Sequence, residues 1–370
     1  MQIHKLVSIV LPTYNGKTFI KQALECCLRQ TYAHFELIVV DDHSTDGTDE
    51  IVKEYAARDQ RVAYWRNETN QQLPASLNKG FSLAKGEYYT WTSDDNLFAE
   101  NAVEEMVKAL DSQDQYSLVY SSYKMINDKN KIIDEYRAVP ESLLFGCAVG
   151  ACFLYKKEIH ESLMGYDEQK FRMEDYDFWL RACLRYKFLF IDRPDLYSYR
   201  KHKANLSSKI FRDEELFRRY KEDYLRTLTT FFEGIAPGFS KEDIENHVDI
   251  FFNNLVQQRN YTVDTSENLQ KLQLHFEKLR AIPWEETFFS PARMQAVINN
   301  KQNELLVGLV NTLLFENLQL KRQNPRIAKQ LNKPLFWYYR EYETLPAWYK
   351  KAGHIIKILQ GNRPVRKSGN

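Results

Sequence analysis

The stretch Val7–Leu11, VSIVL, is a short and almost entirely apolar run, and the turn sequence PTYNGK follows it at once. A run of this kind is typical of a β-strand that is covered on both faces. Helical spacing of apolar residues comes next, over Phe19–Leu28. The chain therefore opens with a strand, a turn and a helix, which is the first unit of an α/β fold.

The same alternation continues through the first half of the chain. Further strands are predicted at Phe35–Val40, Val62–Trp65, Glu87–Thr92 and Leu118–Ser122, and further helices at Thr45–Ala57, Leu73–Ala84 and Ala99–Leu110. The pattern is less regular between residues 123 and 199, where a last strand is predicted at FLFID. This order predicts an α/β domain with a mostly parallel sheet flanked by helices.

The strand patterns stop after about residue 211. Three long segments between Phe211 and Arg322 have apolar residues at i, i+3 and i+4 and charged residues on the opposite face, which is typical of amphipathic helices. A chain of 370 residues is long enough for two cores. We predict an α/β domain over residues 1–210 and a helical C-terminal module over residues 211–370.

The composition excludes several classes of protein. Lys and Arg number 51 against 50 Asp and Glu, a net charge of +1, so no overall field favours nucleic acid. No run approaches the roughly 20 apolar residues of a membrane span, and the start lacks the features of a signal peptide. The five cysteines form no CxxC pair, which favours reduced, buried thiols and a cytoplasmic location.

Two pairs of neighbouring carboxylates follow predicted strands, Asp41-Asp42 and Asp94-Asp95. Ligands of parallel sheets bind at the carboxyl ends of the strands, so one ligand could contact both pairs. Carboxylate oxygens suit Mg²⁺ or Mn²⁺, which usually also bind substrate phosphates. The alternative is turn and helix-capping chemistry, and a carboxylate pair alone does not decide between the two.

Six motifs occur in one order: VSIVLPTYNG, FELIVVDDHSTDGT, SLNKGFSLAKGEYYTWTSDDN, VGACFLYKKEI, MEDYDFWLRA and SYRKHKANLS. This set resembles the inverting glycosyltransferases of family 2, which have the GT-A fold, over residues 7–208. The resemblance implies a metal-dependent enzyme that moves a sugar from a nucleotide-sugar, by family habit a UDP-sugar, to a hydroxyl of a glycan or lipid-linked acceptor. Synthesis of a bacterial surface polysaccharide is the implied setting. The alternative is a catalytically silent nucleotide-sugar-binding scaffold protein.

The resemblance also assigns nucleotide-sugar contacts, to Pro12, Thr13, Tyr14, Asp41, Asn78 and Asp94. The Tyr14 ring is expected to stack on a pyrimidine, and Asp41 to accept a hydrogen bond from uracil N3–H, which suits an acceptor-only side chain. Asp42 is expected to order the following turn. Asp94 is the ribose-side carboxylate.

The same comparison gives the metal ligands and the general base. Asp95 is the expected direct ligand of Mn²⁺ or Mg²⁺, and His202 meets the metal or the diphosphate. Asp175 resembles the catalytic base that an inverting transfer needs to take the acceptor proton. Its neighbour Glu174 is the other candidate, because adjacent acids are easily confused in sequence.

Two features depart from this pattern or lie outside it. Gln72 stands where many members have glycine, so an easy positive-φ position is missing. The tail after residue 348 carries six Lys or Arg and no acid, and such a segment either lies on an anionic membrane surface or packs on the helical module. Both interpretations stay open, as does the existence of a homo-oligomer.

Overall fold

The computed structural model describes residues 5–170, 172–202, 205, 213–236, 238–256, 265–287, 289–302 and 305. The chain divides into two compact units, one formed by Met1–Val256 with Ile282–Met294 and the other by Gln257–Ala281 with Gln295–Asn370. The domain boundary that we expect near residue 210 stays a prediction. The basic tail lies outside the described residues.

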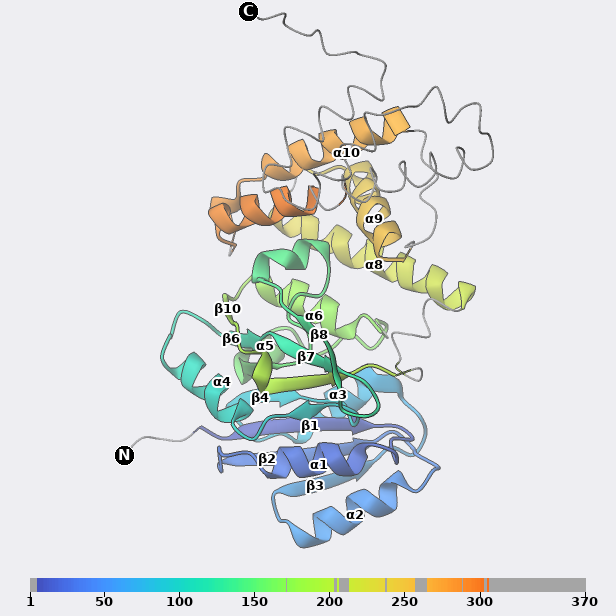
Figure 1. Ribbon diagram of the computed structural model, residues 1–370, viewed down its shortest axis with the longest axis vertical. Helices are drawn as coiled ribbons and strands as arrows, with labels where there is room; N and C mark the ends of the chain where they lie inside the picture. Colours follow the sequence, from blue (N-terminus) through green and yellow to red (C-terminus); the bar gives the residue numbers. More distant parts are fainter. Residues whose placement is uncertain are drawn as a thin grey trace, which may run out of the picture. The chain divides into compact units, whose positions relative to one another are not determined.

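The first unit is built on a seven-stranded sheet in the order β10-β6-β9-β4-β1-β2-β3 (Figure 1). Its strands are β1 Val7–Thr13, β2 Phe35–Asp41, β3 Val62–Arg66, β4 Tyr88–Trp91, β6 Leu118–Ser121, β9 Phe153–Lys156 and β10 Phe188–Ile191. Neighbouring strands run parallel except where β9 pairs with β4 and β6. The predicted fold class, α/β with a mostly parallel sheet, is confirmed.

Helices cover both faces of this sheet, as the continuous apolar strands require. Val7, Ile9 and Leu11 share a buried cluster with α1, α2 and α4, whereas Val10 faces α3, where a Cβ on Gly80 would lie 2.4 Å from its side chain. The bounds of these helices are α1 Ile20–Leu28, α2 Thr48–Arg58, α3 Gln72–Leu83 and α4 Ala102–Asp111. Strand β1 therefore lies at the centre of the core.

A second, four-stranded sheet has the order β5-β11-β7-β8. Its strands are β5 Leu97–Phe98, β7 Tyr123–Ile126, β8 Ile132–Tyr136 and β11 Tyr197–Arg200. The sequence did not predict this sheet. It matters for the site because β5 follows Asp94 and Asp95 directly and pairs with β11, which ends just before His202.

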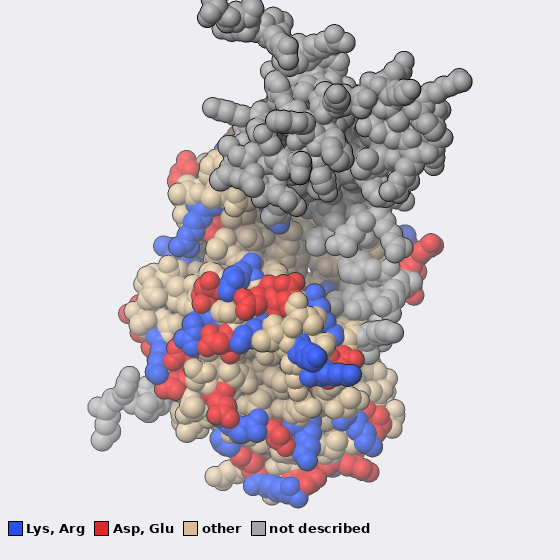
Figure 2. All heavy atoms as spheres, in the orientation of Figure 1, with Lys and Arg blue, Asp and Glu red and all other residues tan. Residues whose placement is uncertain are grey.

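The remaining elements of the first unit are α5 Lys157–Ser162, α6 Glu174–Cys183, α8 Glu214–Ile235, α9 Lys241–Val256 and the 3₁₀ turns η1 Pro140–Phe145, η2 Pro194–Leu196 and η3 Trp284–Glu286. The second unit contains α10 Thr265–Arg280. Helices after residue 213 agree with the predicted helical C-terminal region. None of the described helices is both long and apolar enough to cross a membrane. On the face in Figure 2, basic and acidic side chains are interspersed over the coloured part of the chain.

Candidate active site

The carboxyl ends of the central strands bring the expected nucleotide residues together. Thr13 ends β1 beside Asp41 at the end of β2, and Thr13 Oγ1 donates a hydrogen bond of 2.5 Å to Asp94 Oδ2. Burial, and then the charge of Asp95, raises the pKa of Asp94 to about 7. Gly16 lies against the same carboxylate, because a Cβ there would come within 2.0 Å of Asp94 Oδ2. The loop after β1 thus closes over Asp94.

The two neighbours of Thr13 differ in exposure. Pro12 is buried within β1, opposite Val40 of β2. Tyr14 is 54% exposed, so its ring is available for stacking, as the base-pocket hypothesis requires.

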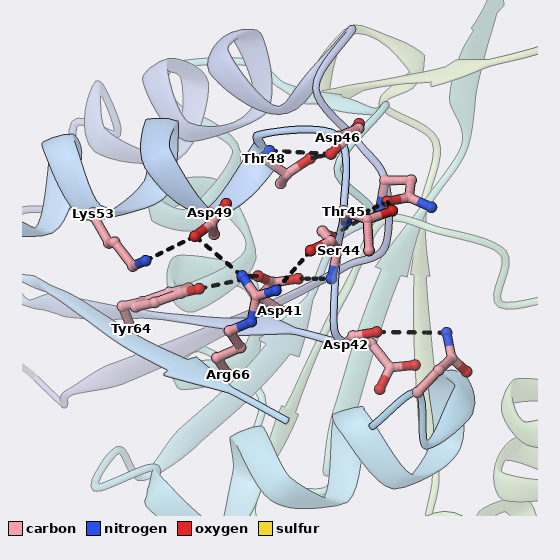
Figure 3. A network of polar contacts seen from close by, with 12 residues as sticks. Asp41, Asp42, Ser44, Thr45, Asp46, Thr48, Asp49, Lys53, Tyr64 and Arg66 are labelled. Atoms are coloured by element: carbon pink, nitrogen blue, oxygen red, sulfur yellow. Dashed lines mark hydrogen bonds and ion pairs between the residues drawn. The ribbon is translucent and has the colours of Figure 1, made fainter. Parts of the chain in front are cut away.

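The carboxylate of Asp41 is fully buried and already engaged (Figure 3). Its Oδ1 accepts from the Ser44 backbone at 2.8 Å, and its Oδ2 accepts from the Tyr64 hydroxyl at 3.0 Å and from Arg66 at 3.3 Å. Arg66 also donates to the Ser44 carbonyl at 2.7 Å. This network orders the turn after β2, the task that we expected of Asp42.

Asp42 instead holds the loop that leads into α3. Its Oδ1 accepts from the Asn67 amide at 2.8 Å and from the Gln71 backbone at 2.7 Å, while its Oδ2 accepts from the Gln72 backbone at 2.9 Å. Gln72 has a φ of +71°. The left-handed conformation that glycine would favour here is therefore kept by a residue with a side chain.

Asn78 uses its side chain on the protein itself. Its amide donates to the Tyr166 carbonyl at 2.8 Å and to Glu168 at 3.1 Å, and its oxygen accepts from the Tyr166 backbone at 2.9 Å. These bonds fix the chain after α5 to α3. The assignment of Asn78 as a nucleotide-sugar contact stays a prediction.

Asp95 and His202 meet at the edge of the second sheet. His202 Nε2 lies 2.9 Å from Asp95 Oδ2, and both side chains are 16% exposed. The Asn205 amide donates to the same oxygen at 3.2 Å. Burial raises the pKa of Asp95, and the contact with His202 opposes that rise. Carboxylate and imidazole are both metal-ligand types, and a carboxylate oxygen is a ligand that suits Mn²⁺ or Mg²⁺.

A metal ion bound by Asp95 and His202 would have most of its coordination positions filled by substrate and water. Among the described residues, no set of three or more His, Cys, Asp or Glu side chains is arranged to hold a metal ion on its own. Few protein ligands combined with substrate phosphates are usual for Mg²⁺ in nucleotide sites. The residues present therefore fit a divalent ion that binds together with a diphosphate.

The adjacent acids at the start of α6 have different surroundings. Glu174 is 4% exposed and its Oε2 accepts from the Arg172 backbone at 2.5 Å. Asp175 is half-buried; its Oδ1 accepts from the Tyr176 backbone at 2.7 Å and its Oδ2 lies 3.7 Å from Cys147 Sγ. Burial raises the pKa of both carboxyls, and the charge of Asp175 raises that of Glu174 further. Asp175 is therefore the more accessible of the two.

Comparison with known proteins identifies the chain. The family model described as "Glycosyl transferase family 2" matches residues 8–164. An uncharacterized glycosyltransferase of Methanocaldococcus jannaschii is 31% identical over 199 residues, 50% of this chain and 68% of that protein. The chain belongs to glycosyltransferase family 2. Another uncharacterized glycosyltransferase, from Rickettsia typhi, is 29% identical over 60% of this glycosyltransferase and 73% of its own length.

Other relatives of the glycosyltransferase differ in length or carry a more specific name. A Rickettsia bellii relative is much longer, and the match spans 34% of it. The putative teichuronic acid biosynthesis glycosyltransferase TuaG of Bacillus subtilis is 28% identical over 39% of this chain and 57% of its own length.

Solved structures bear out the GT-A fold. S. aureus TarS, residues 1–349, in complex with UDP-GlcNAc has a TM-score of 0.53 at 17% identity, over 75% of this chain and 82% of that one. GalNAc-T7 with UDP, GalNAc and Mn²⁺ has a TM-score of 0.51 at 17% identity, over 74% of this chain and 55% of that one.

One buried residue of the glycosyltransferase site was missed by sequence reasoning. Arg200 is 0% exposed; its Nε donates to the Asp95 carbonyl at 2.8 Å, and its terminal nitrogens donate to the Asn127 carbonyl, Asn130 and Gln22. Burial lowers its pKa. Arginine is rarely buried unless paired, and the partners of Arg200 come from distant segments of the chain, so no local pattern in the sequence indicates this role.

Proposed function

We propose that the enzyme transfers a sugar from a UDP-sugar to a hydroxyl group of a glycan or lipid-linked acceptor, with a divalent metal and with inversion at the anomeric carbon. The observation that carries this proposal is the convergence of Asp95 and His202, at 2.9 Å, beside Asp94 at the carboxyl end of β4. That is the edge at which open α/β sheets bind their ligands.

The donor side of the proposal rests on this edge and on the structural neighbours. Tyr14 offers an exposed ring, and Thr13 and Asp94 form the adjoining polar wall. TarS was solved with UDP-GlcNAc and GalNAc-T7 with UDP, GalNAc and Mn²⁺. We assign Asp95 and His202 as metal ligands, and a bound Mn²⁺ or Mg²⁺ would neutralise charge on the departing diphosphate. Among the residues assigned to nucleotide-sugar binding, Asp41 has the weakest support. Its carboxylate already accepts three hydrogen bonds from the protein.

Asp175 supplies the base in this proposal. The acceptor oxygen attacks the anomeric carbon while the bond from that carbon to the diphosphate oxygen breaks, and the acceptor proton passes to Asp175. A single displacement of this kind inverts the configuration. Burial raises the pKa of Asp175, which makes it a stronger base than an exposed aspartate. Glu174, more deeply buried, is expected to keep its proton and to support the turn before α6.

The acceptor class follows from relatives rather than from contacts. TuaG carries teichuronic acid biosynthesis in its name, and we propose a bacterial surface polysaccharide as the product.

The test is a screen of sugar nucleotides with the purified full chain and Mn²⁺, with released nucleoside diphosphate as the readout. Water replaces the acceptor hydroxyl in this reaction, so the same base takes the proton. We expect turnover with a UDP-sugar. Asp175→Asn should bind UDP and Mn²⁺ normally but turn over roughly 10² to 10⁴ times more slowly, the range attributed to general base catalysis.

Glu174→Gln is the matched control at the neighbouring position and should lose much less activity. If Glu174→Gln is inactive and Asp175→Asn is normal, the base is Glu174. If both variants are normal, the proton goes elsewhere. Nucleotide binding without turnover of any donor would favour the scaffold alternative.

A further inference from the structure

The two helices that open the C-terminal region contact both segments that surround Asp175. Helix α8 packs on α6, which carries Asp175, and helix α9 packs on η1, which leads to Cys147. Helices α6, α8 and α9 all belong to the first compact unit. Helices α8 and α9 also pack on each other, with the rings of Phe232 on α8 and His247 on α9 5.1 Å apart.

Helix α8 forms a hydrogen bond with the turn that precedes Asp175. Lys170 is 5% exposed, and its Nζ donates to Thr227 Oγ1 of α8 at 2.7 Å. The Lys170 carbonyl accepts from the Met173 backbone at 2.8 Å, directly before α6 begins. The ring of Tyr224, also on α8, stacks on Tyr176 with centroids 5.5 Å apart.

The buried ammonium makes this contact costly to lose. Burial lowers the pKa of Lys170, because a charged amine away from water is stabilised only by the groups that bind it. Besides Thr227, the Asp223 carbonyl accepts from the same nitrogen at 3.5 Å. The hydrogen bond to the Thr227 hydroxyl is therefore the shorter of the two that hold the Lys170 side chain against α8.

Helix α9 holds the other segment. His247 is 0% exposed, and its Nε2 donates to the Leu144 carbonyl of η1 at 2.8 Å. The neighbouring Leu143 carbonyl accepts from the Tyr176 hydroxyl at 2.7 Å, which joins η1 to α6. Three residues after Leu144 comes Cys147, whose thiol faces Asp175.

We propose that α8 and α9 form a clamp that positions the carboxylate of Asp175, and that Thr227 and Lys170 are positioning residues for it. This inference rests on the proposed function of Asp175. In this proposal, the start of the helical region positions a catalytic group as well as stabilising the fold.

Two variants of Thr227 and one of Thr230 test the clamp. Thr227→Val removes the hydroxyl at nearly constant shape, Thr227→Ser keeps it, and Thr230→Val makes the same change at an exposed position of the same helix. We expect Thr227→Val to slow UDP-sugar hydrolysis by about tenfold, since small misplacements of catalytic groups cost rate. Thr227→Ser and Thr230→Val should stay close to the wild-type rate. The UDP affinity with Mn²⁺ should be unchanged in all three.

Lys170→Met and the double variant complete the experiment. If both residues act through one bond, the double variant falls no further than the single ones. A normal rate in Thr227→Val, or a rate loss matched by an equal loss of UDP affinity, would overturn the clamp. Asp175→Asn is measured alongside: if it turns over normally, the proposed base is wrong, whereas an impaired Asp175→Asn with a normal Thr227→Val removes only the clamp.

Discussion

His202 Nε2 lies 2.9 Å from Asp95 Oδ2, although the two residues are 107 positions apart in the chain. The pairing of β5 with β11 makes this contact possible, because the first strand follows Asp95 and the second precedes His202. A metal site formed by this contact depends on a sheet that the sequence did not predict.

Asp95→Asn should keep the fold and lose metal-dependent nucleotide binding. A neutral amide is a poor ligand for a hard dication, so we expect UDP affinity in the presence of Mn²⁺ to fall at least about tenfold. Calorimetry with and without Mn²⁺ measures it. Asp134→Asn, the same change at an exposed position of β8, is the control. Equal affinity of Asp95→Asn and wild type would make Asp95 a turn residue.

Asp41→Asn should lower the free energy of unfolding by about 1–3 kcal/mol, the usual cost of disturbing a buried hydrogen-bonded group. The reason is that Ser44, Tyr64 and Arg66 all depend on this carboxylate. Urea denaturation gives the stability and calorimetry gives the UDP affinity of the same sample. Loss of UDP affinity with unchanged stability would instead support the base contact that the family resemblance implies.

Gln72→Gly should stabilise the protein by about 1 kcal/mol, because it relieves a left-handed residue that carries a Cβ. Gln71→Gly is the matched control, since Gln71 has a φ of −101° and gains nothing from glycine. Urea unfolding of both variants measures the difference. Equal effects at the two positions would show that the conformation at Gln72 carries no strain.

Protonation of His160 should destabilise the protein in mild acid. Its ring lies among Phe81, Tyr155 and Tyr166, and burial lowers the pKa of His160 to about 4, against about 6.5 in an unfolded chain. The unfolded state therefore binds the proton first, so this contribution is complete above about pH 6.5 and is lost as the pH falls toward 4.

Thermal unfolding between pH 4 and 7 checks this expectation. His160→Gln removes the titrating group and should flatten the fall in melting temperature over that range. A variant whose melting temperature falls as steeply as that of the wild type would assign the acid sensitivity to other groups.

The central sheet was predictable because a strand that is buried on both faces has a nearly continuous apolar sequence, as in Val7–Leu11. The second sheet was not, because β5 is only two residues long and β8 is exposed along most of its length. The start of α2 was placed three residues early, at Thr45. Gly47 has a φ of +90° and the Asp46 carboxylate accepts from the Thr48 backbone, so the helix begins at Thr48.

The candidate site was predictable in its residue types and less so in their tasks. Asp95 and His202 were expected near one ligand and lie in contact. The carboxylates of Asp41 and Asp42 accept hydrogen bonds from groups within residues 64–72. The side chain of Asn78 forms its hydrogen bonds with the chain after α5. Such distant partners leave no local pattern in the sequence.

Arg200 ties the chain at Asp95, the turn of the β7–β8 hairpin and helix α1 to one guanidinium. None of these segments can change length or path without disturbing the other two. A change of the hairpin turn around Asn127 and Asn130 would therefore remove acceptors of this arginine, unless the new turn supplies an acceptor or the arginine is replaced as well. Paired substitutions at these positions, rather than single ones, are the changes that divergence of this enzyme would tolerate.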